Sequence, residues 1–193
     1  DPRDEHSVCE VLGTYQQNLV FADVQTNRLY ELWQQLAALH LARPNINTLT
    51  DMIVCPGWDF CSLANATTHN IAEQIEKQFN DLDYLYDLGE IRLNMSGCMN
   101  ACAHHHTGDI GILGVDKKGE YWYQISLGGN SSNDAKLGKI LGRAVPSDDV
   151  ATTIQKIIDV YLEQRVSNDN DVEGFGELID RIGITPFKEK VYG

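Results

Sequence analysis

The chain has 193 residues, enough for one medium-sized domain or for one domain with part of another. Its net charge is −13, from 15 Lys and Arg against 28 Asp and Glu, which argues against nucleic acid as a partner because phosphate binding requires clustered cations. No stretch approaches the roughly 18 apolar residues of a membrane span and no signal segment opens the chain, so the sequence predicts a soluble, cytoplasmic protein with no membrane partner.

The first elements are a predicted strand and a predicted helix. The segment QNLVFADV predicts a strand at 17–24, because it is rich in β-forming residues. Apolar residues at helical spacing predict a helix over 29–39, and Pro44 prevents that helix from continuing. One strand and one helix are too little to close a core, so this first part is expected to belong to a split domain.

The remaining elements alternate between helices and strands. Turn residues and periodicity predict strands at 90–95, 109–115 and 121–127, and helices at 63–79, 150–162 and 173–184. Ser147 is expected to be the N-cap of the second of these helices. The tail 187–193 is expected to be peripheral.

The five cysteines are unevenly spaced. Cys9 stands alone, Cys55 and Cys61 form a C-x5-C pair, and Cys98 and Cys102 form a C-x3-C pair. Because the chain shows no secretion signal, two pairs flanked by turn residues favour a metal or cluster site over disulfides. The narrower pair suits zinc, whereas the wider pair suits a larger iron–sulfur cluster. Spacing therefore favours a cluster and leaves zinc open.

The second cysteine pair lies in a longer motif, made of Gly97, Cys98 and Cys102 followed by Asp109, Ile110, Gly111 and Ile112. This motif resembles the signature of the sirohaem nitrite and sulfite reductases. The first pair, about forty residues upstream, matches the first pair of that family. Segments 17–24, 127–130 and 173–184 also resemble parts of it, so the resemblance covers nearly the whole chain but only the C-terminal half of a family member.

The resemblance implies an α+β fold. A mixed or antiparallel sheet flanked by helices would form a [4Fe–4S]/sirohaem-binding domain at 48–193, preceded by part of a ferredoxin-like half-domain at 1–47. All four paired cysteines would bind a [4Fe–4S] cluster, and Cys102 would also contact the sirohaem iron. Ser96 and Asn100 are expected to contact sirohaem carboxylates, and no catalytic residue is assigned.

By resemblance, the parent enzyme is an assimilatory reductase that takes sulfite to sulfide or nitrite to ammonia with six electrons, which the cluster passes to sirohaem. The expected partners are the missing N-terminal half of the same polypeptide, a ferredoxin or flavoprotein as electron donor, and sulfite or nitrite. The chain alone is expected to be inactive, because 51–111 holds nine Asp and Glu against only Lys77 and Arg92. The rival interpretation is a non-catalytic structural zinc or iron–sulfur module.

Three consecutive histidines, His104 to His106, follow the second pair. Three neighbouring side chains do not all face one ion, so solvent-exposed histidines, or histidines behind the metal ligands, are expected. Their titration near neutral pH leaves a role in proton delivery open. If the chain turns at 100–104, backbone N–H groups there are expected to point toward the sulfur of Cys102. Cys9 is expected to lie far from the site.

Overall fold

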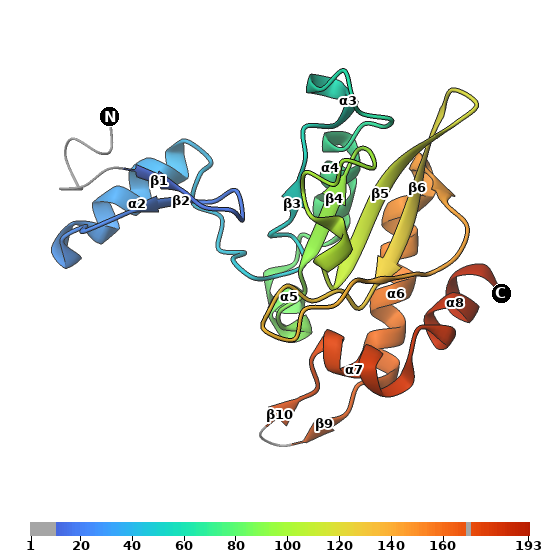
Figure 1. The fold of residues 1–193 in the computed structure, drawn as a ribbon. Helices are drawn as coiled ribbons and strands as arrows, with labels where there is room; N and C mark the ends of the chain where they lie inside the picture. The colour runs from blue at the N-terminus through green and yellow to red at the C-terminus, as the bar shows by residue number, and fades with distance from the viewer. Residues whose placement is uncertain (1–10, 169–170) are drawn as a thin grey trace. The chain divides into compact units, whose positions relative to one another are not determined.

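The computed structural model describes residues 11–168 and 171–193, so Cys9 and its predicted remoteness lie outside the described residues. The chain divides into two compact units, Asp1–Ile46 and Asn47–Gly193 (Figure 1).

The first unit contains an antiparallel hairpin and a helix. Strand β1 (Val11–Gly13) pairs with β2 (Leu19–Phe21), and the turn η1 (Thr26–Arg28) leads into α2 (Leu29–Ala38). The predicted helix is present, and the predicted strand is shorter than 17–24. Leu32 is the only buried residue of α2, so this unit closes little core of its own. Its assignment to a ferredoxin-like half-domain stays a prediction.

The second unit is built on a sheet of six strands in the described part of the chain. Its first three strands in chain order run parallel to one another. The fourth strand, β6 (Glu120–Leu127), forms a hairpin with the third and is antiparallel to each of its neighbours in the sheet. This mixed sheet agrees with the predicted α+β class. The strands are β3 (Ile53–Val54), β4 (Leu93–Ser96), β5 (Ile110–Lys117), β6 (Glu120–Leu127), β7 (Lys139–Ile140) and β8 (Val145–Pro146).

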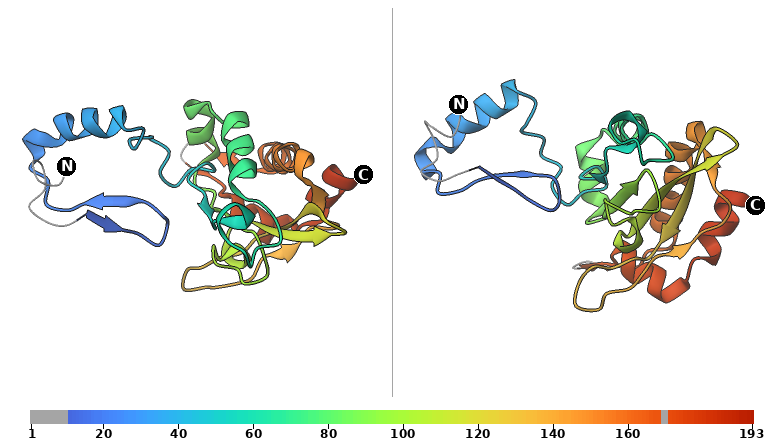
Figure 2. Two further views of the ribbon diagram at one scale, coloured as in Figure 1. Left: turned by 90° about the horizontal axis from the view of Figure 1, so that it is seen from above. Right: turned by 45° about the horizontal axis from the view of Figure 1, so that its top comes forward.

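Helices α4 (His69–Gln78) and α6 (Val150–Gln164) lie side by side over one face of this sheet (Figures 1 and 2). Their inward-facing isoleucines are fully buried against the sheet residues, and this layer forms the core. The other elements are short. The helices are α3 (Gly57–Phe60), α4 (His69–Gln78), α5 (Leu82–Leu88), α6 (Val150–Gln164), α7 (Phe175–Ile182) and α8 (Thr185–Tyr192), with turns η2 (His105–Thr107) and η3 (Ser147–Asp149) and the hairpin β9 (Ser167–Asn168)–β10 (Asp171–Val172).

Three details differ from the sequence predictions. Helix α4 begins at His69 rather than at 63, because the preceding segment is held against the sheet by Thr68, whose hydroxyl donates to Cys55 O at 2.6 Å. Ser147 lies in η3, and α6 follows with Asp149 at its N-cap, so the predicted cap is wrong. The tail is not peripheral, since Phe187 in α8 is fully buried.

None of the helices in the described residues is long and apolar enough to cross a membrane.

Candidate functional site

The two cysteine pairs follow the carboxyl ends of two neighbouring parallel strands. Val54 of β3 pairs with Met95 of β4, and Cys55 N–H donates to Met95 O at 3.0 Å. Cys55 therefore leaves the sheet beside the point where the chain leads into Cys98. Because parallel strands end at the same edge, the sheet brings together pairs that lie about forty residues apart in sequence.

Hydrogen bonds join the two cysteine loops directly. Gly97 N–H donates to the Cys55 sulfur at 3.0 Å. Gly97 O accepts from Asn65 N–H at 2.8 Å and from Ala66 N–H at 3.1 Å. The residue before Cys98 is thus bound to both ends of the loop that carries Cys55 and Cys61, which fixes the two loops against each other.

Two glycines make this close contact possible. Gly57 has a φ of +63°, and a Cβ there would lie 2.8 Å from Thr68 N. A Cβ on Gly97 would lie 2.8 Å from Ala66 O and 3.0 Å from the Cα of Gly57. A larger residue at Gly97 would therefore push one loop away from the other, whereas a larger residue at Gly57 would collide with Thr68.

The four thiols differ in exposure. Cys55 and Cys98 are buried, Cys61 is partly buried, Cys102 is exposed, and all four are free. In the described residues, no three His, Cys, Asp or Glu side chains are grouped so that they would hold a single metal ion. Convergence of the four sulfurs on one cluster stays a prediction.

Three of the N–H groups in the turn at 100–104 bond to acceptors other than the Cys102 sulfur. Ala101 N–H donates to Cys98 O at 3.2 Å, and His104 N–H donates to Ala101 O at 2.8 Å. Ala103 N–H donates to the Ser96 hydroxyl at 3.3 Å. The chain does turn here, with Ala101 at φ +55°, but these three donors satisfy the turn itself and do not point at the thiol. These three donors therefore do not support the argument for Cys102, and the assignment of Cys102 stays a prediction.

Ser96 and Asn100 occupy different environments. Ser96 is buried at the end of β4, where its hydroxyl holds the second cysteine loop. Asn100 is exposed in that loop. The structure gives Ser96 a loop-positioning contact, and the sirohaem contacts of both residues stay predictions.

One of the three histidines is buried, whereas the sequence allowed both solvent-exposed histidines and histidines behind the metal ligands. His105 is 5% exposed, and its Nδ1 has no hydrogen-bond partner within the described part of the chain. Burial, together with the neighbouring charge of His106, lowers the pKa of His105 to about 4. The two rings lie 3.9 Å apart, and both neighbours of His105 are exposed. His105 is therefore a neutral, buried ring at neutral pH, behind the second cysteine loop.

An ion pair that sequence reasoning missed braces the strands under the site. Arg92 donates through its backbone N–H and Nε to Asp109 Oδ2 at 2.9 and 3.0 Å, and through Nη2 to Oδ1 at 3.0 Å. The motif Asp109 thereby ties the start of β5 to β4. It also engages Arg92, one of the two cations between 51 and 111, while the other, Lys77, lies 4.0 Å from Glu73.

The thiols and their surroundings fit an iron–sulfur cluster. Four free thiols are the ligands that a cubane cluster takes, and N–H···S bonds of the kind that Gly97 gives Cys55 are typical around such clusters. Two of the thiols, those of Cys55 and Cys98, are buried, which limits the access of water to their sulfur atoms. When bound, the cluster would supply one-electron transfer.

Three curated relatives are reductases. The "Sulfite reductase [ferredoxin] 2" of Mycolicibacterium paratuberculosis is 28% identical over 159 residues, 77% of this chain and 28% of that protein. The "Assimilatory ferredoxin-dependent nitrite reductase" of Haloferax mediterranei is 25% identical, over 86% of this chain and 29% of that protein. The "Sulfite reductase, assimilatory-type" of Nitratidesulfovibrio vulgaris is 22% identical, over 92% of this chain and 76% of that protein. The chain thus spans less than a third of the length of the first two relatives.

Solved structures share the fold. The Mycobacterium tuberculosis NirA protein has a TM-score of 0.76 and 26% identity, covering 94% of this chain and 33% of that one. Dissimilatory sulfite reductase I has a TM-score of 0.82, covering 99% of this chain and 63% of that one, and at 15% identity this likeness shows the fold alone. Both confirm the predicted fold class.

A family model described as "Nitrite and sulphite reductase 4Fe-4S domain" matches residues 46–193. Together with the relatives, this match confirms the expected [4Fe–4S] cluster, supports sirohaem as its companion, and does not favour the rival zinc module. The chain belongs to the nitrite and sulphite reductase 4Fe–4S domain family.

Proposed function

We propose that this chain is the cluster-binding part of an assimilatory sulfite or nitrite reductase, in which Cys55, Cys61, Cys98 and Cys102 hold a [4Fe–4S] cluster beside sirohaem. The observation that carries the proposal is the junction of the two cysteine loops at the ends of β3 and β4, made by the bond from Gly97 N–H to the Cys55 sulfur. The complete reductase, of which this chain would be one part, would reduce sulfite to sulfide or nitrite to ammonia, and the cluster held by these cysteines would supply one-electron transfer to sirohaem.

The residues of this chain set the properties of the site. The N–H of Gly97 withdraws electron density from the Cys55 sulfur, which stabilises the thiolate and raises the reduction potential of a bound cluster. Burial of Cys55 and Cys98 shields the part of the cluster bound to these two sulfurs from water. Ser96 and the Arg92–Asp109 pair keep the second loop and its strand in place.

We assign Cys102 as the thiolate shared with the sirohaem iron. The main ground is the fourth cysteine of the family motif, and its exposure in this structure supports the assignment because a second group has access to it. Large exposed apolar side chains on both cysteine loops supply a surface that a flat macrocycle would cover. They are Trp58, Phe60, Leu63 and Met99.

The cations for sirohaem carboxylates and the anionic substrate are proposed to come from the missing N-terminal half of the same polypeptide. Arg92 is paired with Asp109, and Lys77 lies near Glu73, so neither of the two cations between 51 and 111 is placed for this task. The chain alone should therefore bind sirohaem weakly and be inactive. The Nitratidesulfovibrio relative, of which this chain covers 76%, favours a second candidate, a short chain that is itself active. Enzyme-like sulfite or nitrite reduction by this chain with sirohaem and a chemical reductant would establish that second candidate and refute the first.

The electron donor is proposed to be a ferredoxin. Two of the relatives described above carry ferredoxin in their names, as does the spinach chloroplast nitrite reductase, which is 25% identical over 80% of this chain. This is tested by mixing a reduced ferredoxin with the reconstituted chain and monitoring reduction of the cluster by stopped-flow absorption near 400 nm.

Single Cys→Ser variants test the cluster directly. The chain is reconstituted anaerobically with iron and sulfide, and iron and acid-labile sulfide are counted per chain. Loss of any cluster ligand should strongly lower both counts, whereas Cys9→Ser, the matched control, should leave both near four. Unchanged iron in two or more of the four variants, or one tightly bound zinc in place of iron, would refute the ligand set.

A longer polypeptide that holds both centres tests the bridge. Cys102→Ser there should abolish the electron spin resonance coupling between cluster and haem and stop multi-electron turnover. Retained coupling and activity in this variant would assign the bridge to another residue.

A further inference from the structure

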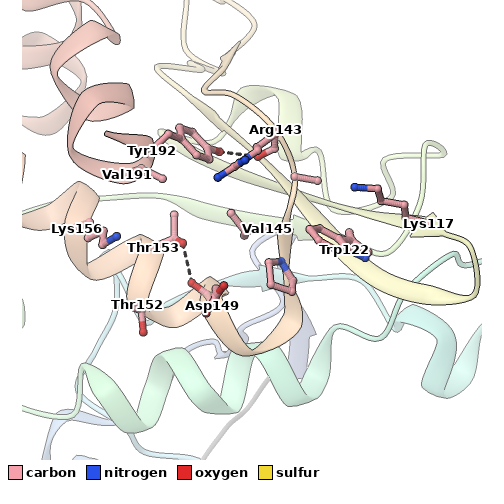
Figure 3. A pocket seen from close by; sticks show the side chains of 12 residues that line it. Lys117, Trp122, Arg143, Val145, Asp149, Thr152, Thr153, Lys156, Val191 and Tyr192 are labelled. Carbon is pink, nitrogen blue, oxygen red and sulfur yellow. Dashed lines mark hydrogen bonds between the residues drawn. The ribbon is translucent and has the colours of Figure 1, made fainter.

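A pocket of about 520 Å³ opens in the second unit, and none of the four paired cysteines lines it. Its walls come from the β5–β6 hairpin, the segment 143–146, the first turns of α6 and the end of α8 (Figure 3). None of these residues takes part in the cluster site described above.

The lining of this pocket is positively charged in a strongly negative chain. Three cationic side chains, those of Lys117, Arg143 and Lys156, line the pocket together with one carboxylate, that of Asp149. They are three of only 15 Lys and Arg in a chain with a net charge of −13. Within the described residues, none of the three forms an ion pair with a carboxylate. The pocket is therefore a local attractor for anions on a surface that otherwise repels them.

Aromatic rings, rather than carboxylates, hold two of these cations. Lys117 Nζ lies 4.1 Å from the centroid of the Trp122 ring. The guanidinium carbon of Arg143 lies 5.8 Å from the centroid of the Tyr192 ring. A cation–π contact orients a cation without neutralising its charge, so both groups keep their N–H donors for an incoming anion.

The wall that carries Arg143 is already in place. The Tyr192 hydroxyl donates to Arg143 O at 2.6 Å, and burial raises the pKa of Tyr192, so this donor keeps its proton at neutral pH. A Cβ on Gly142 would lie 2.5 Å from the same ring, which shows how closely the end of α8 packs on this segment. A preformed wall reduces the ordering that a ligand must impose.

We infer that this pocket binds a multiply charged organic anion, with its charged groups on Arg143 and Lys156 and its flat or apolar part against Trp122 and Tyr192. The volume equals about 17 water molecules at ~30 Å³ each, more than a single inorganic anion fills. Val145, Pro146 and Val191 add apolar lining. The N-terminus of the 15-residue α6 adds the favourable end of a helix dipole on the same side.

Calorimetric titration of the 193-residue chain tests the inference with two probes. ADP carries two phosphates and a planar ring, whereas pyrophosphate carries the charge alone. ADP should bind at least tenfold more tightly than pyrophosphate, and raising NaCl from 20 to 150 mM should weaken ADP binding severalfold. Arg143→Gln and Lys156→Gln should each raise the Kd of ADP about tenfold.

Lys188→Gln is the matched control, because it removes the same charge from an exposed position on α8 that does not line the pocket. This variant should change the Kd of ADP less than twofold. Absence of binding at 5 mM ADP, equal weakening by Lys188→Gln, or pyrophosphate binding as tightly as ADP would each overturn the inference. Tighter binding of a hexaglutamate peptide than of ADP would also overturn it, since the pocket would then accept an acidic protein segment.

Discussion

Gly97→Ala should separate the two cysteine loops without touching a cysteine. The added Cβ would lie 2.8 Å from Ala66 O and 3.0 Å from Gly57 Cα, whereas ordinary contact begins at 3.4 Å. One loop must therefore retreat by about 0.4–0.6 Å, and because these neighbours are backbone atoms they yield less readily than a side chain. That retreat lengthens the 3.0 Å bond from Gly97 N–H to the Cys55 sulfur.

Overpacking of this kind costs about 1–3 kcal/mol, which lowers the Tm of a unit of this size by roughly 2–12 °C. Scanning calorimetry of the reduced, metal-free chain measures the Tm, and iron counting after reconstitution should show a lower cluster yield. Gly176→Ala in α7 is the control, because its Cβ would meet only Asp109 Oδ1 at 3.5 Å, and its Tm should be unchanged or slightly raised. A Gly97→Ala variant with the Tm and the iron content of the parent would show that the loops do not meet as described.

Three further changes should alter stability in defined ways. Tyr161→Phe removes the hydroxyl that donates to Leu88 O at 3.1 Å and to Glu173 O at 2.9 Å, and urea unfolding should show a loss of about 1–2 kcal/mol. Burial lowers the pKa of His105 to about 4, so on acidification this histidine is protonated in the unfolded chain at a higher pH than in the folded one. The free energy of unfolding should therefore fall by up to about 3 kcal/mol as the pH falls from 6.5 to 4. The Tm of His105→Phe should not show this acid-dependent loss. Hydrogen bonding to Arg181 lowers the pKa of Glu173 to about 2, so the stabilisation by this carboxylate is present above pH 4.5 and lost toward pH 2. A Glu173→Gln variant whose Tm falls as steeply over that range as the Tm of the parent would contradict this.

The sequence predicted the elements whose pattern is local. The apolar alternation on either side of Lys118–Gly119 predicted the hairpin of β5 and β6, and the helical spacing after Asp149 predicted α6. These features depend on neighbours in the sequence, which a single chain displays.

Features that depend on distant contacts were not predictable in this way. Phe187 is followed by three charged residues, and its burial against Phe175 of α7 becomes visible only once the two helices pack. His105 looks like its exposed neighbours in the sequence, and nothing local marks it as the buried one. The pairing of Arg92 with Asp109 joins two strands, so it required the register of the parallel sheet.

Anomalous diffraction at the iron edge, from anaerobic crystals of the reconstituted chain, tests the central claim most directly. We predict one compact group of four iron atoms between the loops 55–61 and 98–102, with the sulfurs of Cys55, Cys61, Cys98 and Cys102 each at bonding distance from a different iron. Iron bound elsewhere, a single metal ion between the loops, or a cluster bonded to fewer than four of these sulfurs would contradict it.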